Sequence, residues 1–322
     1  MFVGDVERRL RGDALNGRSP GLIAIFLSFL ARGKTCECAI DEPGRYAKPV
    51  ARICASLFLA CLLLSVGASA VADTLTAGGT GSSGPLLRLL FEDFAKTEPG
   101  NTLRIVSPPL GSGGASKALL GGRIGLAILA YKPTDDLLGK STLWFHLADT
   151  PFVMATSDHS ELHDLSIDDL AKIYGREITK WKSGTPIRLI LRASFDTDTK
   201  LLKSMSPAMA IAVDHAAKHS RMPTATDDLE TLDMLTDIQG SLGPISLGHL
   251  RTTQSSLQIV HIGGIQPSPA TLSDGRYPWR KSLYIVLPGK PSVLAAKFAA
   301  YLRSKRGETM LGRYGYLRGA TP

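Results

Sequence analysis

Short apolar runs alternate with longer segments of helical periodicity from about residue 74 to the end of the chain. A short apolar run bounded by polar residues and glycine is typical of a buried strand, whereas apolar residues three or four positions apart are typical of a helix. The pattern predicts strands at 74–78, 102–106, 125–130, 152–155, 187–191, 244–247, 257–262 and 282–287, and helices at 85–96, 115–121, 166–174, 197–204, 207–219, 226–239, 292–304 and 306–314. Because strands and helices alternate, we expect an α/β fold with mostly parallel sheets.

A chain of 322 residues is long enough for two lobes. It contains no internal repeat and no low-complexity linker that would join two domains in series. We therefore expect two lobes, each a mostly parallel sheet flanked by helices, with the chain crossing between them twice. Residues 73–150 and 250–322 are assigned to the first lobe and residues 151–249 to the second.

Residues 45–72 have the pattern of a secretory signal peptide. Three basic residues precede an apolar run at 53–66, and small residues follow it, so cleavage is expected after Ala70 or Ala72. The run is short for a membrane span, and the alternative is an anchor that is retained. Residues 1–44 do not fit a signal, and we interpret them as a mis-called or disordered extension. We expect a periplasmic or secreted protein.

The cysteines all precede the expected cleavage site: Cys36, Cys38, Cys54 and Cys61. The mature chain would then have no disulfide, no thiolate metal site and no cysteine nucleophile. Lipidation of Cys61 is not expected, because the apolar run continues beyond it.

Two runs rich in glycine and serine, at 78–85 and 111–117, each stand between a predicted strand and a predicted helix. Such a turn directs free backbone N–H groups, small hydroxyls and the positive end of a helix dipole towards one point. Two of them predict an oxyanion held between two helix N-termini. The alternative is a pair of tight turns in which glycine and serine only satisfy the backbone geometry.

Charge and motifs exclude several classes of protein. From residue 73 onward, 28 Lys and Arg stand against 23 Asp and Glu, and the bases are scattered, which suits an anionic ligand better than nucleic acid. The run 79–84 matches G-x-G-x-x-G, but no acidic residue ends the second strand, which disfavours a dinucleotide fold. Ser116 and Ala118 depart from a nucleotide phosphate loop, and no G-x-S-x-G elbow occurs.

Two histidine pairs at i,i+4 spacing, His159/His163 and His215/His219, could hold zinc if each lay on a helix. No third ligand accompanies either pair, so we interpret them as solvated polar residues and expect no metal and no cofactor.

Arg192 follows the predicted strand at 187–191 and could bind an oxyanion through two hydrogen bonds from its guanidinium. Thr197 and Thr199 add hydroxyls at the start of the next helix. Asp196 and Asp198 could cap that helix, or one of them could accept a hydrogen bond from a protonated oxyanion such as hydrogen phosphate.

These segments, in this order, resemble the substrate-binding proteins of phosphate-type ABC transporters over about residues 74–315. The sequence LSIDDLAKIYGREITKW at 165–181 is similar to that family's "nLtleqLadIFsGkItnW" segment, and GPISLGHL at 243–250 is similar to its "GaIGYvslgYl". The stretch from Tyr277 to Tyr284 is similar to its "YPlsRPLYvY" strand. The resemblance implies a two-lobed periplasmic-binding fold of type II that closes on its ligand.

The resemblance also implies ligand-binding residues. The first phosphate-contacting loop falls on Ser82, Ser83 and Gly84, the second on Ser112, Gly113 and Gly114, and the arginine of the second lobe on Arg192. The family's third loop reads Ser-Gly-Thr, and here only Thr199 or Thr197 matches it. Gly84 stands where an aromatic or apolar residue is expected, and Ala130 where the family has an aspartate that selects protonated phosphate.

We expect a non-enzymatic solute-binding protein that holds a small oxyanion, with phosphate favoured, and serves an inner-membrane ABC permease as a monomer. Asp198 is hypothesised to replace the missing aspartate as acceptor for a protonated ligand. One alternative is a sensor or regulatory module with altered or lost anion specificity. Another is a phosphoester hydrolase, which lacks a convincing nucleophile–base pair in this sequence.

Overall fold

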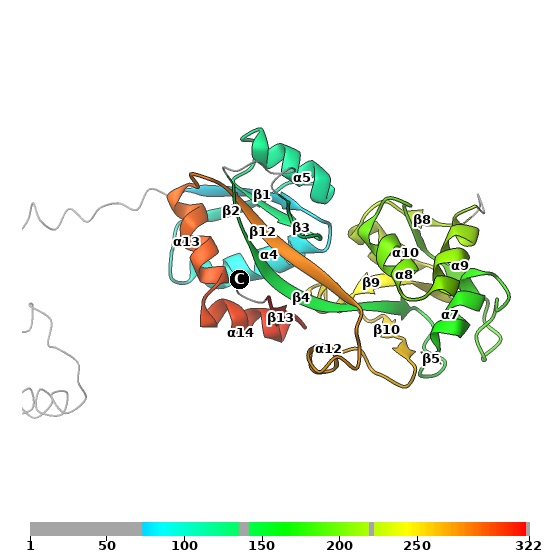
Figure 1. Ribbon diagram of the computed structural model, residues 1–322. Helices are drawn as coiled ribbons and strands as arrows, with labels where there is room; N and C mark the ends of the chain where they lie inside the picture. Colours follow the sequence, from blue (N-terminus) through cyan, green and yellow to red (C-terminus); the bar gives the residue numbers. More distant parts are fainter. Residues whose placement is uncertain (1–72, 135–141, 219–221, 320–322) are drawn as a thin grey trace, which may run out of the picture. The chain divides into compact units, whose positions relative to one another are not determined.

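The computed structural model describes residues 73–134, 142–218 and 222–319 (Figure 1). The predicted extension, the signal peptide and the cysteines lie outside the described residues. All described residues fall in one compact unit, 70–322. Within them, no helix combines the length and the apolar character that crossing a membrane requires.

A central sheet runs through the described part of the chain and contains nine strands. Its order is β2 (Thr102–Ile105), β1 (Thr74–Gly79), β3 (Leu126–Leu129), β12 (Arg280–Pro288), β4 (Thr142–Thr156), β9 (Ser241–Ser246) and β6 (Arg188–Leu189), with β10 (Gln258–Ile259) and β13 (Leu317–Arg318) also paired to β4. Strand β1 is parallel to β2 and β3, and β6 is parallel to β9. Every pairing of β4 and β12 is antiparallel, so the central sheet is mixed: the other strands of each lobe pair in parallel, and the two long strands add the antiparallel pairings.

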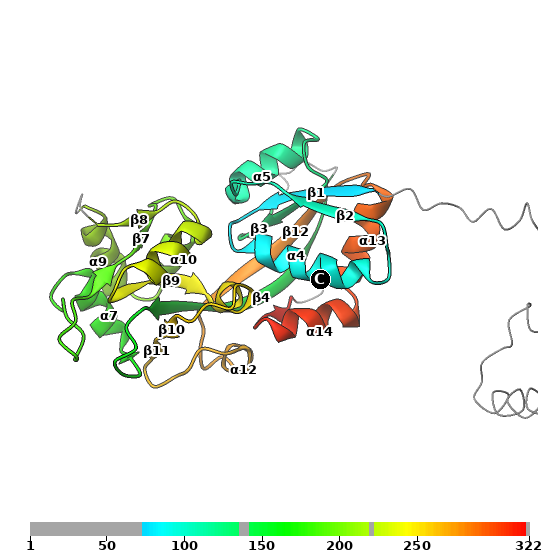
Figure 2. The same ribbon diagram turned by 180° about the vertical axis from the view of Figure 1, so that it is seen from behind.

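The two crossings of the chain are the long strands β4 and β12, which lie side by side in both views (Figures 1 and 2). The first part of β4 pairs with β12, and its last five residues, Phe152–Thr156, pair with β9. The sequence predicted only 152–155 of this strand. Polar residues such as His146 and Asp149 interrupt the apolar pattern of its first half, which hides the strand.

The first lobe has helices on both faces of the sheet. Residues Leu126 and Ile128 pack with α4 (Ser83–Ala95), α13 (Val293–Leu302) and α14 (Lys305–Arg313). The alternate residues Ala127 and Leu129 pack with α5 (Gly111–Leu120). Because successive residues of a strand point to opposite faces, α5 and the other three helices cover opposite sides, as Figure 1 shows.

The second lobe is built in the same way on the end of β4. Phe152 and Met154 join one apolar core, and Val153 and Ala155 join another. The remaining elements are β5 (Asp164–Leu165), α7 (Ile167–Tyr174), β7 (Leu191–Arg192), α8 (Thr197–Ser204), α9 (Pro207–Ala217), β8 (Thr224–Ala225), α10 (Asp228–Asp237), α11 (Leu247–Thr252), β11 (His261–Ile262) and α12 (Pro269–Ser273).

Several predicted elements have the expected bounds, and others differ for local reasons. Helix α8 spans 197–204 as predicted, and Ser166 caps α7 by accepting from the Asp169 N–H at 3.0 Å. The predicted strand at 187–191 is broken, because β6 pairs with β9 whereas β7 pairs with β8. The short helices α11 and α12 were not predicted.

The core of the second lobe contains Val260, Ile262 and Tyr277 beside Phe152. Tyr277 also donates its hydroxyl to the Phe152 carbonyl at 2.7 Å. We propose that the chain returns to the first lobe near Trp279, where β12 begins, and not near residue 250.

Candidate functional site

The first glycine- and serine-rich run links β1 to the N-terminus of α4. Gly79 lies so close to β3 that a Cβ there would be 2.2 Å from the Ile128 side chain, so only glycine fits. The Ser83 hydroxyl donates to the Thr80 carbonyl at 2.6 Å and tightens the turn. We call residues Thr80–Gly84 the first loop.

The first loop donates to a carboxylate from the second lobe. Thr80 Oγ1 donates to Asp228 Oδ2 at 2.8 Å, and the Ser82 backbone N–H donates to the same oxygen at 3.0 Å. Asp228 is the first residue of α10 and is only 2% exposed. The loop thus presents hydroxyl and N–H donors to an oxygen anion, here one that belongs to the same chain.

A buried lysine from the crossing strand β12 lies against the same carboxylate. Lys281 Nζ is 2.6 Å from Asp228 Oδ1 and 2.8 Å from Asp198 Oδ1, and Lys281 is 2% exposed. Burial alone would lower the pKa of Lys281, but the charges of Asp198 and Asp228 raise it above the usual value. Lys281 is therefore a permanent cation shared by two carboxylates.

Arg192 stands at the end of β7 and is also buried. Its Nη1 donates to Thr231 Oγ1 at 2.6 Å, and its Nη2 donates to Asp196 Oδ2 at 2.7 Å. Within the described residues, Nε has no hydrogen-bond partner, and the same is true of Ser82 Oγ. Both atoms are thus buried donors with unused capacity.

We call these residues the inter-lobe cluster: Thr80, Ser82, Arg192, Asp196, Asp198, Asp228, Thr231 and Lys281. Three carboxylates face two cations in it. Burial would raise the pKa of Asp228, but Lys281 and Arg192 hold it well below its usual range. Burial raises the pKa of Asp198 to about 6, against the attraction of Lys281. The cluster has one carboxylate more than it has cations, and Asp198 is the carboxylate whose charge is least well compensated.

The cluster contains only three of the predicted ligand-binding residues, namely Ser82, Arg192 and Asp198. Ser83 stays within the first loop through its own hydrogen bond, and Gly84 is the next residue of α4. The other positions lie in the second run and at the start of α8.

In the second run, Ser112 Oγ accepts the Ala130 N–H at 2.9 Å and so fastens α5 to the end of β3. Gly113 is exposed and Gly114 is half-buried in the first turn of that helix, which starts at Gly111 and not at 115. Thr199 Oγ1 donates to the Ala193 carbonyl at 2.9 Å, and Thr197 is half-buried.

Four residues of the cluster were not predicted from the sequence: Thr80, Asp228, Thr231 and Lys281. Thr80 lies inside the recognised run, and Asp228 looks like an ordinary residue of a helix start. Lys281 carried a usable signal, because it occupies the inward-facing row of β12 that continues with Leu283, Ile285 and Leu287. A lysine in an apolar row implies a buried counter-charge.

The histidine pairs form no site in the described residues. His159 and His163 lie outside any helix, and the His163 ring lies 4.1 Å from Trp181 between ring centroids. Helix α9 ends at Ala217, and His219 is outside the described residues. No group of three residues able to ligate a metal occurs in the part of the chain that the structure describes.

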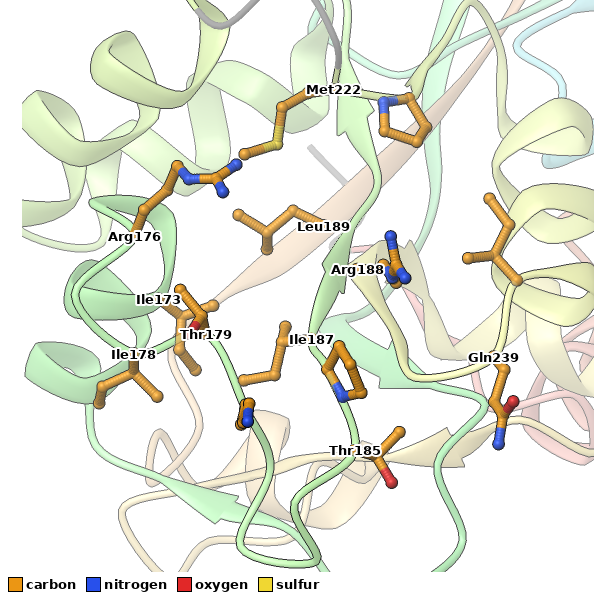
Figure 3. A pocket seen from close by; sticks show the side chains of 14 residues that line it. Ile173, Arg176, Ile178, Thr179, Thr185, Ile187, Arg188, Leu189, Met222 and Gln239 are labelled. Carbon is orange, nitrogen blue, oxygen red and sulfur yellow. The ribbon is translucent and has the colours of Figure 1, made fainter.

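A groove of about 1250 Å³ lies on the second lobe beside the edge strand β6 (Figure 3). Apolar side chains such as Ile187 and Leu189 line it together with the basic residues Arg176, Lys180 and Arg188. None of the residues of the inter-lobe cluster lines this groove.

A family model described as the PBP superfamily domain matches residues 65–306. The chain therefore belongs to this family. It is 21% identical over 241 residues to the phosphate-binding protein PstS of Bacillus subtilis, covering 74% of this chain and 78% of that protein. The resemblance to substrate-binding proteins of phosphate-type transporters is confirmed.

Solved structures show the same fold. A phosphate-bound putative phosphate ABC transporter substrate-binding protein from Clostridium perfringens has a TM-score of 0.63 at 15% identity, with 77% of this chain and 100% of that chain covered. An ABC-type phosphate transport receptor from Vibrio cholerae has a TM-score of 0.53 at 16% identity, with 76% of this chain and 100% of that chain covered. These likenesses confirm the two-lobed periplasmic-binding fold.

Proposed function

We propose that this protein is an extracytoplasmic solute-binding protein that holds a small oxyanion, phosphate first, between its two lobes and delivers it to an ABC permease. The family and the names of its relatives support this function, since they include phosphate-binding and phosphate-transport proteins. The signal-like segment at 45–72 supports export of the protein from the cytoplasm.

The observation that carries the proposal is the contact of the first loop with a carboxylate. Thr80 Oγ1 and the Ser82 N–H both donate to Asp228 Oδ2 at the N-terminus of α4. A phosphate oxygen accepts the same kind of hydrogen bonds, and the helix dipole favours it equally. A site that already holds one oxygen anion has the donors needed for another.

The buried donors with unused capacity extend this site. Ser82 Oγ and Arg192 Nε have no partner among the described residues, and both residues are more than nine-tenths buried. A tetrahedral anion offers more acceptor atoms than a carboxylate and could use such donors. We assign the anion to Thr80, Ser82 and Arg192, with Asp198 as the candidate acceptor for a protonated ligand.

The remaining residues implied by the resemblance are retained as secondary candidates, to be tested after these: Ser83, Gly84, Ser112, Gly113, Gly114, Thr197 and Thr199. Of these, Ser83, Ser112 and Thr199 already use their hydroxyls in local hydrogen bonds. We also propose that the protein is a monomeric binding protein and not an enzyme, because its relatives are named for binding and transport.

A second candidate function is a sensor or regulatory module of the same fold. The observation that favours it is the excess of carboxylates in the inter-lobe cluster, since Asp196, Asp198 and Asp228 all oppose a second anion. Transport predicts tight binding of one anion, whereas a regulatory module with a degenerate site predicts none.

Equilibrium dialysis with radiolabelled phosphate, with sulfate as competitor, tests the proposal. We expect one phosphate per chain, and Arg192→Ala should weaken binding at least tenfold, because a buried charge-assisted contact contributes about 1.5–3 kcal/mol. Arg188→Ala removes an exposed arginine of the same lobe and should change binding less than twofold. Equal binding by both variants would remove Arg192 from the site, and absence of binding up to 10 mM phosphate would favour the regulatory module.

A further inference from the structure

The first loop donates its hydrogen bonds to the Asp228 carboxylate, a contact that the proposed function alone does not require. We propose that Asp228 is a built-in competitor for the oxyanion: its carboxylate takes the first-loop donors, and phosphate binds only when Asp228 withdraws. This inference rests on the proposed function, because it assumes that the first loop is the oxyanion site.

The carboxylate makes the contacts that an anionic ligand would make. Asp228 Oδ2 accepts from Thr80 Oγ1 at 2.8 Å and from the Ser82 N–H at 3.0 Å, while Oδ1 is 2.6 Å from Lys281 Nζ. Two donors of the first lobe and one buried cation thus converge on a single carboxylate, which is the arrangement expected for a bound anion.

Asp228 has no role in its own helix that would explain this position. The N-cap of α10 is Asp227, which accepts the N–H groups of Leu229 and Glu230 at 2.7 and 3.0 Å. The hydrogen bonds of the Asp228 side chain go to the first loop and to Lys281, both of them distant in sequence. Capping therefore does not account for a second aspartate at this site.

The space at this contact is too small for both anions. A Cβ added to Gly81 would be 3.0 Å from the Asp228 backbone nitrogen and 3.2 Å from its Cβ, so the first loop lies directly against the start of α10. Phosphate is larger than a carboxylate and carries the same sign of charge. An oxyanion on Thr80 and Ser82 must therefore displace the Asp228 side chain.

The carboxylate also leaves one donor of the loop unused. Ser82 Oγ is buried without a partner in the described residues, although the Ser82 N–H is bound. The Asp228 carboxylate does not accept from this hydroxyl, whereas a tetrahedral anion offers more oxygen atoms that could. Asp228 thus satisfies fewer donors of the first loop than a bound phosphate could, so phosphate can displace it.

With competition of this kind, the apparent affinity for phosphate equals the intrinsic affinity multiplied by the fraction of molecules in which Asp228 is withdrawn. Asp228→Asn removes the charge that competes and releases Lys281 towards the ligand. We expect this variant to bind phosphate at least tenfold more tightly than the natural chain. Asp233→Asn removes an exposed carboxylate from the same helix and should change the affinity less than twofold.

The affinity test uses isothermal titration of the full chain with inorganic phosphate. Tighter binding by Asp228→Asn supports the competition, and equal or weaker binding by Asp228→Asn overturns it while the proposed function stands. If neither the natural chain nor this variant binds phosphate up to 10 mM, the proposed function fails, and the competition fails with it.

A second measurement tests the contact itself without a ligand. Hydrogen–deuterium exchange of the first loop should be slow in the natural chain and faster in Asp228→Asn, because the Ser82 N–H loses a charged acceptor and keeps at most the weaker amide oxygen. Gly81→Ala should also speed this exchange, since it pushes the loop from α10 without changing any charge. Unchanged exchange of the first loop in both variants would overturn the proposal.

Discussion

Lys281 is the residue on which the electrostatic balance of the inter-lobe cluster depends, and Lys281→Met tests that dependence. Methionine has a similar length and fits a buried position, so the substitution removes the charge with little change in volume. It leaves Asp198 and Asp228, which are 1% and 2% exposed, without their shared ammonium. We expect a large loss of stability.

The magnitude follows from burial. Breaking a buried ion pair by removal of one partner costs about 3–5 kcal/mol, because the remaining charge is left uncompensated. Asp228 keeps its hydrogen bonds from Thr80 and Ser82. The uncompensated buried charge is therefore mainly that of Asp198, whose pKa burial already raises to about 6. For a domain of this size, 1 kcal/mol changes Tm by about 2–4 °C, so Tm should fall by roughly 10 °C.

Calorimetry of the purified chain at neutral pH measures this loss. The matched control is Lys297→Met, since Lys297 is also 2.8 Å from a carboxylate, that of Glu98, but its side chain is half exposed. An exposed pair contributes about 0–1 kcal/mol, so Tm should fall by no more than about 4 °C. The double variant Lys281→Met/Asp198→Asn should have a higher Tm than Lys281→Met, because it no longer buries the Asp198 carboxylate without a counter-charge.

Equal changes in Tm for the two lysine variants would refute the reasoning, since burial would then make no difference to the cost. A double variant less stable than Lys281→Met alone would refute the inference that the uncompensated Asp198 carboxylate causes the loss of stability.

Three further predictions follow from single residues. Gly248→Ala should destabilise the chain by several kcal/mol in urea unfolding, because a Cβ there would lie 2.1 Å from the ring of Tyr316. Asp198 has a folded-state pKa of about 6 against an ordinary value of 3.8, so the folded state binds more protons between these values and stability should fall as pH rises from about 4 to 6. In Asp198→Asn this slope should be shallower, as urea unfolding across that pH range would show. Ser166→Ala removes a capping box and should cost about 1 kcal/mol, again in urea unfolding.

The sequence predicts those parts of the fold that depend on local signals. Ser166 begins α7 because its hydroxyl and the Asp169 carboxylate satisfy each other's backbone donors, and this pattern is visible in four residues. The strand expected at 187–191 was divided for a reason that no local pattern contains. Its two halves pair with β9 and β8, which come from later parts of the chain.

The site was less predictable, because it forms from residues that meet only in the folded chain. Ser82 and Arg192 could be proposed from runs and strand ends, but Asp228 is 146 positions away from Ser82 in sequence. Lys281 was not predicted either, although a lysine in an inward-facing row of a strand signals a buried counter-charge before its partner is known.

The first loop and Arg192 are proposed to form an oxyanion site that Asp228 also occupies. A crystal structure of the full chain grown with saturating phosphate tests it most directly. We expect the anion within hydrogen-bond distance of the Ser82 N–H, Thr80 Oγ1 and Arg192, with Asp228 displaced from Ser82. Asp228 still bound to Ser82, with no anion on the first loop, would contradict the account.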